Sequence, residues 1–243
     1  TACSSSTLAL GMAAELLEDG EAEVVLTGGS DALCRLTFAG FNSLRAVDPG
    51  PCRPFDRSRK GLTLGEGSAI LVLELADRAR RRGVTPYARV LGYGATNDAF
   101  HMTQPEPSGA AWARTLANAL EDAGMAAAEI DHINAHGTAT EQNDAAECAA
   151  YARVLGARLA EIPLTSLKGA LGHCLGAAGA IEAAVTCLSI ARGVPLSEES
   201  GIGSLTLGRY VREIAERYGP REAAMIEIDG ETERWTYDEL LAK

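Results

Sequence analysis

One cysteine, two histidines and one lysine are the residues of this chain whose types and spacing could do chemistry together. Cys3 lies in the segment TACSSS, directly before residues with helical apolar spacing. A thiol at the first turn of a helix faces unpaired N–H groups and the positive end of the helix dipole. We therefore expect a lowered pKa and a nucleophilic thiolate at Cys3, although a buried structural thiol remains the alternative.

Both histidines lie where the chain passes between a strand and a helix. His136 is in NAHGTAT, at the end of an expected strand, and His173 is in KGALGHCLGAAG, just before an apolar helix. Sites of open α/β sheets gather at the carboxyl ends of strands, and the adjacent glycines would let a substrate approach the backbone. Lys168 is in an apolar segment, where a lysine is usually paired or functional. This set predicts a Cys–His site for acyl or thiol chemistry, with two structural loop histidines as the alternative.

Two acidic residues follow His136 on the next expected helix. Asp144 and Glu147 are one turn apart and therefore share a helix face. A buried pair of carboxylates could hold Lys168 in its charged form. A solvated acidic pair at the first turn, favoured by the helix dipole, is the other interpretation.

Strands that alternate with helices must position these residues. The alternation predicts an α/β protein with a mostly parallel sheet. The helix that follows His173 is apolar on nearly every side, so we expect it to be buried. The expected strands cover residues 24–27, 68–75, 86–94, 130–137 and 162–169, and the expected helices cover residues 8–17, 76–83, 109–124, 144–155 and 176–193.

Composition excludes several classes of function. The chain of 243 residues is 47% hydrophobic and 23% charged, which is typical of globular proteins. A net charge of −11 argues against a nucleic-acid partner. We find no uninterrupted apolar run of about 18 residues and no secretory signal, so we expect no membrane contact and a cytoplasmic setting. The six cysteines form no C-x-x-C pair, which predicts free, mostly buried thiols rather than disulfides or a zinc site.

Six segments, in order, resemble the β-ketoacyl-acyl carrier protein synthases, which are condensing enzymes of the thiolase superfamily. They are TACSSS, GGSDAL, CRPFDRSRKGLTLGEGSAILVLE, NDAFHMTQP, NAHGTATEQNDAAE and KGALGHCLGAAGAIEA, and they cover residues 1–195. The match is best to the elongating type with a Cys–His–His site. The resemblance implies an α/β, thiolase-like fold of αβαβα layers. It also implies that this fold is incomplete, because the first half before the nucleophile and a C-terminal Gly-Phe-Gly loop have no counterpart here.

The resemblance implies a decarboxylative Claisen condensation. Cys3 would take an acyl chain from a carrier-protein thioester, and His136 and His173 would hydrogen-bond the malonyl thioester oxygen as it becomes an enolate oxygen. The product would be a 3-oxoacyl-acyl carrier protein. The remaining matches are to supporting charged residues (Lys168, Asp144, Glu147), pantetheine contacts (Thr138, Thr140), the acyl pocket and entrance (Phe41, His101, Thr103) and a carrier-protein contact (Arg45).

The resemblance also implies the partners. An acyl carrier protein would deliver both thioesters, and a second copy of the chain would complete a homodimer. No metal is expected, and no cofactor beyond the phosphopantetheine that the carrier protein holds. A catalytically inactive fragment that only joins modules or binds a partner remains an alternative. A thiolase shares the fold, but its second catalytic cysteine in a Cys-Gly loop has no counterpart in this sequence.

The end of the chain has a different composition. Residues 196–204 are typical of a linker, and residues 205–243 resemble the N-terminal piece of an acyl-activating, adenylate-forming (AMP-binding) enzyme. This piece predicts a helix over residues 205–219 and then a hairpin whose turn is Asp229-Gly230. We expect no adenylation chemistry from it, because the phosphate-binding loop of those enzymes is absent from the sequence.

Overall fold

The computed structural model describes residues 1–193, 222–228 and 231–236. The chain divides into two compact units, Thr1–Leu196 and Ser197–Lys243. The first unit carries every candidate site residue. Its strands are β1 (Val24–Asp31), β2 (Gly67–Glu74), β3 (Ile133–Asn134) and β4 (Leu164–Thr165), and its helices are α1 (Ser5–Glu18), α2 (Arg35–Ser43), α3 (Ala76–Arg81), α4 (Ala110–Asp122), α5 (Glu141–Leu155), α6 (Lys168–Leu171) and α7 (Ala178–Arg192).

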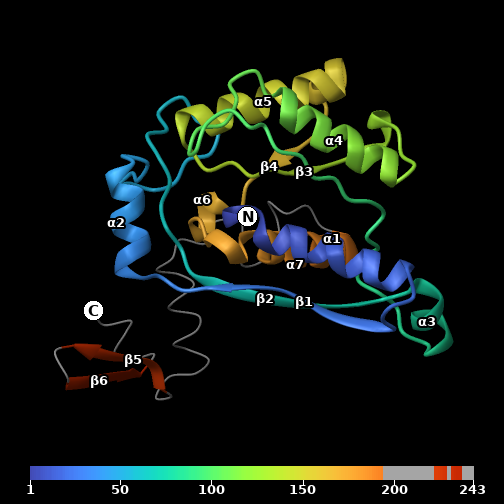
Figure 1. Ribbon diagram of the computed structural model, residues 1–243, viewed down its shortest axis with the longest axis horizontal. Helices are drawn as coiled ribbons and strands as arrows, with labels where there is room; N and C mark the ends of the chain where they lie inside the picture. Colours follow the sequence, from blue (N-terminus) through green and yellow to red (C-terminus); the bar gives the residue numbers. More distant parts are fainter. Residues whose placement is uncertain (194–221, 229–230, 237–243) are drawn as a thin grey trace. The chain divides into compact units, whose positions relative to one another are not determined.

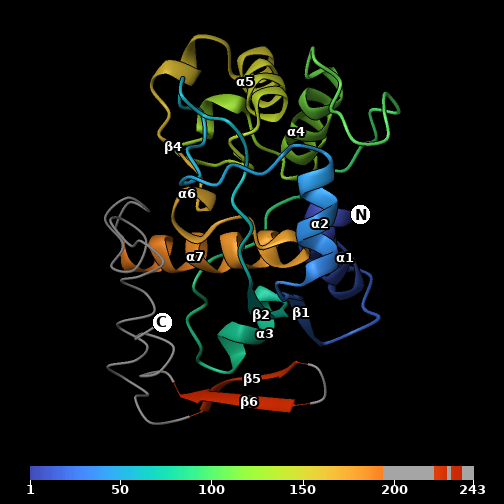
Figure 2. The same cartoon turned by 90° about the vertical axis from the view of Figure 1, so that its left-hand side faces the viewer.

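Sheets and helices of the first unit alternate in layers (Figure 1). The β1–β2 pair forms one layer, and α1 and α7 pack side by side on one of its faces. The β3–β4 pair and then α4 and α5 follow on the far side of α1 and α7, as the view turned by 90° also shows (Figure 2). This is the layered α/β arrangement that the sequence predicts. Within the described residues, no helix covers the outer face of β1–β2.

The β1–β2 pair is antiparallel, which differs from the expected parallel sheet. Asp31 pairs with Gly67 and Val24 pairs with Glu74. The chain between the strands therefore returns to the same end of β1 that it left, and this reverses the direction of β2. The expected strand of residues 24–27 is also too short, because Gly28 and Gly29 continue the pairing instead of ending it.

The β3–β4 pair is parallel, as expected, but each strand has only two residues. The expected strand of residues 86–94 is wrong, since this segment forms no strand. Val90 and Leu91 are 52% and 51% exposed, so the apolar pattern of the segment is not matched by burial against a sheet. The Tyr93 N–H instead donates to Asp122 Oδ2 at 2.8 Å.

The helices agree more closely with the sequence pattern. Helices α3 and α4 confirm two expected helices, and α5 begins at Glu141, three residues earlier than expected. Helix α2 was not expected, and neither was the short α6, which begins at Lys168 inside the expected strand of residues 162–169. The prediction that the helix after His173 is buried holds only in part, because most of α7 is half-buried and Ile190 is 62% exposed.

Helix α7 and the turn before it form a long apolar segment. Leu175–Arg192 is long and apolar enough to cross a membrane by length and composition alone, with a mean hydropathy of 1.3. Core helices meet the same criterion, and this helix packs on β1, β2 and α1. Glu182 interrupts its apolar sequence and forms an ion pair inside the protein.

Apolar side chains gather in one core and on one open face. The core cluster beneath α5 comprises Ala135, Tyr151, Leu155 and Ile162. On the outer face of β1–β2, the side chains of Leu26, Ile70 and Val72 are 71%, 63% and 65% exposed. An apolar sheet face of this kind is typical of a surface that another layer covers.

The second unit contains an antiparallel hairpin of β5 (Glu222–Ile228) and β6 (Glu231–Thr236). This confirms the two strands that the sequence predicts for the tail. The expected linker of residues 196–204, the helix of residues 205–219 and the turn at residues 229–230 lie outside the described residues. The resemblance of residues 205–243 to an adenylate-forming enzyme stays a prediction.

Close packing of α1 against α7 allows no side chain at Gly179. A Cβ built there would lie 2.0 Å from Thr7 Oγ1 and 2.9 Å from Thr7 N. We expect Gly179→Ala to lower the free energy of unfolding by about 1–3 kcal/mol, because α1 must shift to admit the methyl group.

Gly40→Ala in α2 is the matched control for this measurement. Nothing lies within 4 Å of a Cβ at Gly40, so this substitution should leave stability unchanged or raise it by up to about 1 kcal/mol. Urea unfolding of both variants checks the prediction. Equal stabilities of the two variants would contradict the described helix packing.

Candidate active site

The structure brings Cys3, His136 and His173 together from three separate segments. One potential ligand atom of each side chain lies within 4.8 Å of those of the other two. The two imidazole rings meet edge to face, with centroids 5.3 Å apart and an interplanar angle of 84°. A thiol and two imidazoles at these distances can share one small reacting group.

Cys3 lies in a 3₁₀ turn, Ala2–Ser4, that runs directly into α1. The start of the helix therefore lies where the sequence predicts it, but the pKa of the thiol does not move in the predicted direction. Burial raises the pKa of Cys3, and the nearby Lys168 ammonium opposes this only in part. The expectation of a lowered pKa is wrong because packing around the turn removes water from the thiol, and desolvation disfavours a thiolate.

His173 is held from both sides of its backbone and by its ring. Its N–H donates to Thr63 O at 2.7 Å, and its carbonyl accepts from Gly65 N at 3.0 Å. The ring Nδ1 accepts a hydrogen bond from Leu175 N at 3.1 Å. An Nδ1 that accepts carries no proton, so the neutral ring carries its proton on Nε2, from which it can donate.

The His136 loop is held by the carboxylate of Glu147. Glu147 Oε1 accepts from His136 N at 2.7 Å, and Oε2 accepts from Gly137 N at 2.8 Å. Gly137 has a φ of 42°, and a Cβ there would lie 2.6 Å from the side chain of Ser166. The glycine beside His136 thus permits close protein packing, and the substrate approach expected from the sequence stays a prediction.

Asp144 holds a neighbouring part of the same loop. Its carboxylate is 1% exposed and accepts from Ala139 N at 3.2 Å and from Phe55 N at 2.7 Å. The guanidinium of Arg59 lies 3.5 Å from it. Asp144 and Glu147 are therefore buried on one face of α5, and they stabilise loops rather than a solvated helix end.

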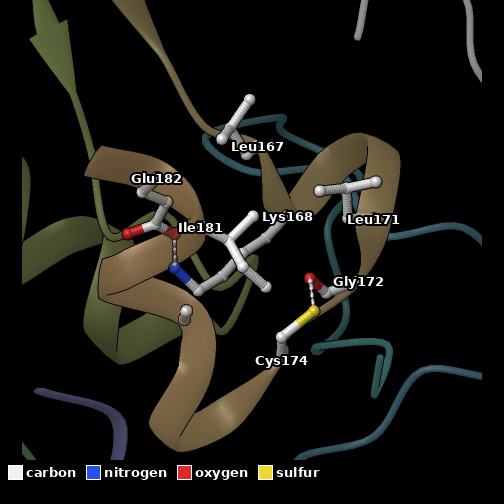
Figure 3. Close-up of a pocket in the computed structure, with 8 residues that line it drawn as sticks. Leu167, Lys168, Leu171, Gly172, Cys174, Ile181 and Glu182 are labelled. Carbon is white, nitrogen blue, oxygen red and sulfur yellow. Dashed lines mark hydrogen bonds and ion pairs between the residues drawn. The ribbon is translucent and has the colours of Figure 1, made fainter. Parts of the chain in front are cut away.

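Lys168 pairs with Glu182 and not with Asp144 or Glu147, which corrects the expected pairing. Its Nζ lies 2.5 Å from Glu182 Oε1, and the lysine side chain is 1% exposed. Figure 3 shows the two side chains facing each other, with Lys168 coming from α6 and Glu182 from α7. The sequence signal for this partner is a single carboxylate, Glu182, within an apolar helix, but that signal does not specify which cation it pairs with.

Burial and the nearby ammonium together determine the charge state of both imidazoles. Burial, with a smaller contribution from the Lys168 charge, lowers the pKa of His173 to about 3. Burial, Lys168 and His173 together lower the pKa of His136 well below 6.5. Both rings are therefore neutral hydrogen-bond donors at neutral pH. The same positive charge disfavours a metal cation among these three side chains.

Left-handed backbone conformations occur close to each of the three side chains. Ala2, Ala139 and Leu175 have φ values of 51°, 64° and 49°. Non-glycine residues rarely adopt this conformation, which costs about 1–3 kcal/mol and is concentrated at functional sites. The loops are therefore fixed in shapes that the surrounding hydrogen bonds impose.

The residues expected to bind pantetheine, acyl chain or carrier protein lie in different settings. Thr138 is buried and its hydroxyl lies 2.9 Å from that of Thr140, beside His136. Phe41 is half-buried on α2, and Arg45 is exposed two residues after it ends. His101 and Thr103 were expected at the site entrance, and Arg45 at the carrier-protein contact. Within the described residues, no hydrogen bond or ion pair joins any of the three to the side chains of the central Cys–His–His set.

Comparison with protein families decides what kind of site this is. Residues 1–79 match the beta-ketoacyl synthase N-terminal domain, and residues 87–197 match the beta-ketoacyl synthase C-terminal domain. The chain belongs to the β-ketoacyl synthase family. This confirms the family that the motifs suggested and the α/β, thiolase-like fold that it implies.

Curated members of this family are similar over most of the chain. The tetracenomycin polyketide synthase ketoacyl synthase alpha subunit of Streptomyces glaucescens is 44% identical over 201 residues, which is 80% of this chain and 47% of that protein. The 3-oxoacyl-[acyl-carrier-protein] synthase 2 of Rhizobium meliloti (strain 1021) is 43% identical over 78% of this chain and 47% of its own length. The chain thus spans about half the length of the curated relatives it matches.

Solved ketosynthases share the fold. A type II polyketide ketosynthase, in complex with its acyl-carrier protein and bound to a hexaketide, is 39% identical with a TM-score of 0.77. The match covers 79% of this chain and 49% of that one. A ketosynthase in complex with its chain length factor from Xenorhabdus doucetiae is 38% identical with a TM-score of 0.73, over 85% of this chain and 50% of that one.

Thiol reactivity follows from these surroundings. The exposed Cys34 caps α2, and hydrogen bonds from Thr37 lower its pKa. Since the thiolate is the nucleophile, limiting iodoacetamide at neutral pH should modify Cys34 before Cys3, whose pKa is raised. Mass mapping of the labelled peptides, with Cys34→Ser as the control, measures this order. Modification of Cys3 ahead of Cys34 would contradict the described burial of Cys3.

Acid should destabilise the fold through His173. Its pKa is about 3 when folded, against an ordinary value of 6.5 for histidine, so the unfolded chain binds more protons between these values. Stability is therefore lost as the pH falls below 6.5, by about 2 kcal/mol from this residue between pH 7 and pH 5. Urea unfolding at both pH values should show this loss reduced in His173→Asn and retained in the exposed control His101→Asn. An unchanged loss in His173→Asn would contradict the neutral buried ring.

Proposed function

We propose that this chain carries the condensing centre of a β-ketoacyl synthase that acts in fatty-acid or polyketide biosynthesis. It would join an acyl thioester on Cys3 to the malonyl group of an acyl carrier protein, giving a 3-oxoacyl-acyl carrier protein and CO₂. The observation that carries this proposal is the meeting of one thiol with two neutral imidazoles, the buried His173 and the half-buried His136, beside a paired lysine. The family membership of the chain supports it.

The acyl group is loaded first. The sulfur of Cys3 attacks the carbonyl carbon of an acyl thioester, the new C–S bond forms, and the bond to the carrier's sulfur breaks. The proton of the Cys3 thiol is transferred to the departing carrier thiolate, which leaves as a thiol. Burial raises the pKa of the resting thiol, and the positive charge of Lys168 nearby opposes this effect and favours the thiolate.

Decarboxylation of the malonyl group follows. Its C–CO₂⁻ bond breaks, CO₂ leaves, and the electron pair forms an enolate whose negative oxygen needs donors. His173 carries its ring proton on Nε2, because its Nδ1 accepts from Leu175 N, and the neutral His136 ring lies beside it. Fixed donors at a developing oxyanion are usually the largest contribution to such catalysis.

The new carbon–carbon bond completes the cycle. The enolate carbon attacks the acyl carbonyl on Cys3, the C–S bond to Cys3 breaks, and the thiolate takes a proton. Neutral imidazoles suit this step, because an imidazolium would protonate the enolate before it attacks. We assign the buried Thr138 and its partner Thr140 to the pantetheine arm that delivers the malonyl group.

An acyl carrier protein is the expected partner, with phosphopantetheine as its own prosthetic group. The solved relatives include a ketosynthase with its acyl-carrier protein and one with a chain length factor. The exposed apolar face of β1–β2 supports a further covering layer. We propose that a second ketosynthase-type chain, in a homodimer or a pair with a related subunit, contributes to the complete enzyme.

The same open face favours a second candidate function. A sheet face that exposes Leu26, Ile70 and Val72 is also what a partner-binding fragment without catalysis would show. The two candidates differ in what they require of Cys3. Only the enzyme needs its thiol.

A condensation assay tests the proposal. Purified chain with acyl- and malonyl-carrier protein should give a 3-oxoacyl product that mass spectrometry detects on the carrier. Cys3→Ala should lower product formation at least about 1,000-fold, because the two imidazoles then lack the thiol that carries the acyl chain between them. Cys34→Ala, which removes an exposed thiol, should keep the wild-type rate. No product from the wild-type chain, or equal rates for wild type and Cys3→Ala, would leave the partner-binding candidate.

A further inference from the structure

Tyr151 is a buried residue whose hydroxyl the condensation mechanism does not yet use. It lies on α5, one turn after Glu147, and its ring belongs to the apolar cluster with Ala135, Leu155 and Ile162. The residue is 7% exposed. Its hydroxyl donates to Glu147 Oε1 at 2.6 Å. A phenylalanine would fill the same apolar space, so the hydroxyl alone needs an explanation.

Glu147 is a buried carboxylate held by hydrogen-bond donors. It is 3% exposed and accepts four hydrogen bonds. Two come from the backbone of the His136 loop at 2.7 and 2.8 Å, one comes from Asn143 Nδ2 at 3.3 Å, and the shortest comes from Tyr151. No lysine or arginine of the described residues forms an ion pair with it. The donors alone must therefore keep this carboxylate charged.

The groups around Glu147 act on its pKa in opposite directions. Burial raises its pKa, and the Tyr151 hydroxyl gives the largest opposing contribution. Asp144 on the same helix also raises the pKa of Glu147, and Glu182 on α7 and Cys148 are the other titratable groups nearby. Burial and Glu147 raise the pKa of Tyr151 itself, so the phenol keeps its proton and stays the donor.

We propose that Tyr151 is a positioning residue of the condensing site: its hydroxyl keeps the Glu147 carboxylate ionised, and that carboxylate fixes the backbone that aims His136. The inference rests on the proposed function for its catalytic meaning. It goes beyond the assigned residues, because Tyr151 touches neither the thiol nor the imidazoles. The apolar core under α5 is thereby connected to the reacting centre through one O–H···O bond and two N–H···O bonds.

Loss of the hydroxyl has a specific consequence. In Tyr151→Phe the ring still fills the core, but Glu147 loses its shortest donor. A hydrogen bond to a charged acceptor is worth enough to move a pKa by about one unit or more. Glu147 should therefore take up a proton at a pH about one unit higher, and the His136 amide should lose its charged acceptor at that pH. A purely structural tyrosine would change stability without moving this midpoint.

Backbone NMR with ¹⁵N-histidine measures this directly. The label gives one amide signal for each of the four histidines, and His136→Gln identifies the one from the loop. We expect the pH midpoint of the His136 amide shift to move up by about one unit in Tyr151→Phe. It should stay in place in Tyr87→Phe, which makes the same change at a 66% exposed ring. In Glu147→Gln the titration should disappear, and adding Tyr151→Phe should change nothing more.

The outcomes separate this inference from the proposed function. An unmoved His136 midpoint in folded Tyr151→Phe would overturn the positioning role, whatever the activity of the chain. A moved midpoint with an active wild-type chain should come with an acid limb of condensation shifted by the same amount. A moved midpoint with no condensation by the wild-type chain would keep the coupling of Tyr151 to the His136 loop but refute its catalytic meaning.

Discussion

The ion pair between Lys168 and Glu182 is the constraint on which the rest of the site depends. An ammonium that is 1% exposed must be paired inside the protein, and Glu182 does this from the neighbouring helix at 2.5 Å. Burial lowers the pKa of both imidazoles most, and the positive charge of Lys168 acts in the same direction. The same charge opposes the effect of burial on the pKa of Cys3. Removing one partner of such a buried pair commonly costs about 3–5 kcal/mol, so packing and chemistry are linked through the same two side chains.

Two buried carboxylates also hold the loops around this charge in place through hydrogen bonds. The His136 loop is too irregular to satisfy its own backbone N–H groups, and Asp144 and Glu147 accept hydrogen bonds from three of them. Asp144 also accepts one from Phe55 N on another segment. Both acids lie on one face of α5, so one helix fixes the position of several loop atoms at once. A buried carboxylate that binds backbone N–H groups is stabilised in its charged form, which is why the loop can be both irregular and rigid.

Residue types and spacing were sufficient to predict the family, most helices and the three central side chains, since these depend on local pattern. The pKa of Cys3 could not be predicted, because burial by segments far away in the sequence outweighs the helix end. The partner of Lys168 was also missed, since a lone Glu182 in an apolar helix does not specify which buried cation it meets. Residues 86–94 have the alternation of a strand, but pairing needs a neighbour that local pattern does not supply.

The charge state of the two imidazoles is the claim that connects the fold to condensation, and ring-nitrogen NMR measures it most directly. With ¹⁵N-labelled histidine at neutral pH, and His173→Asn to assign the signals, the account predicts a neutral His173 ring. Its Nδ1 should be unprotonated and its Nε2 should carry the hydrogen, as the bond from Leu175 N requires. An imidazolium signal, or a ring with the proton on Nδ1, would contradict the account, because such a ring could not act as the neutral donor that the enolate needs.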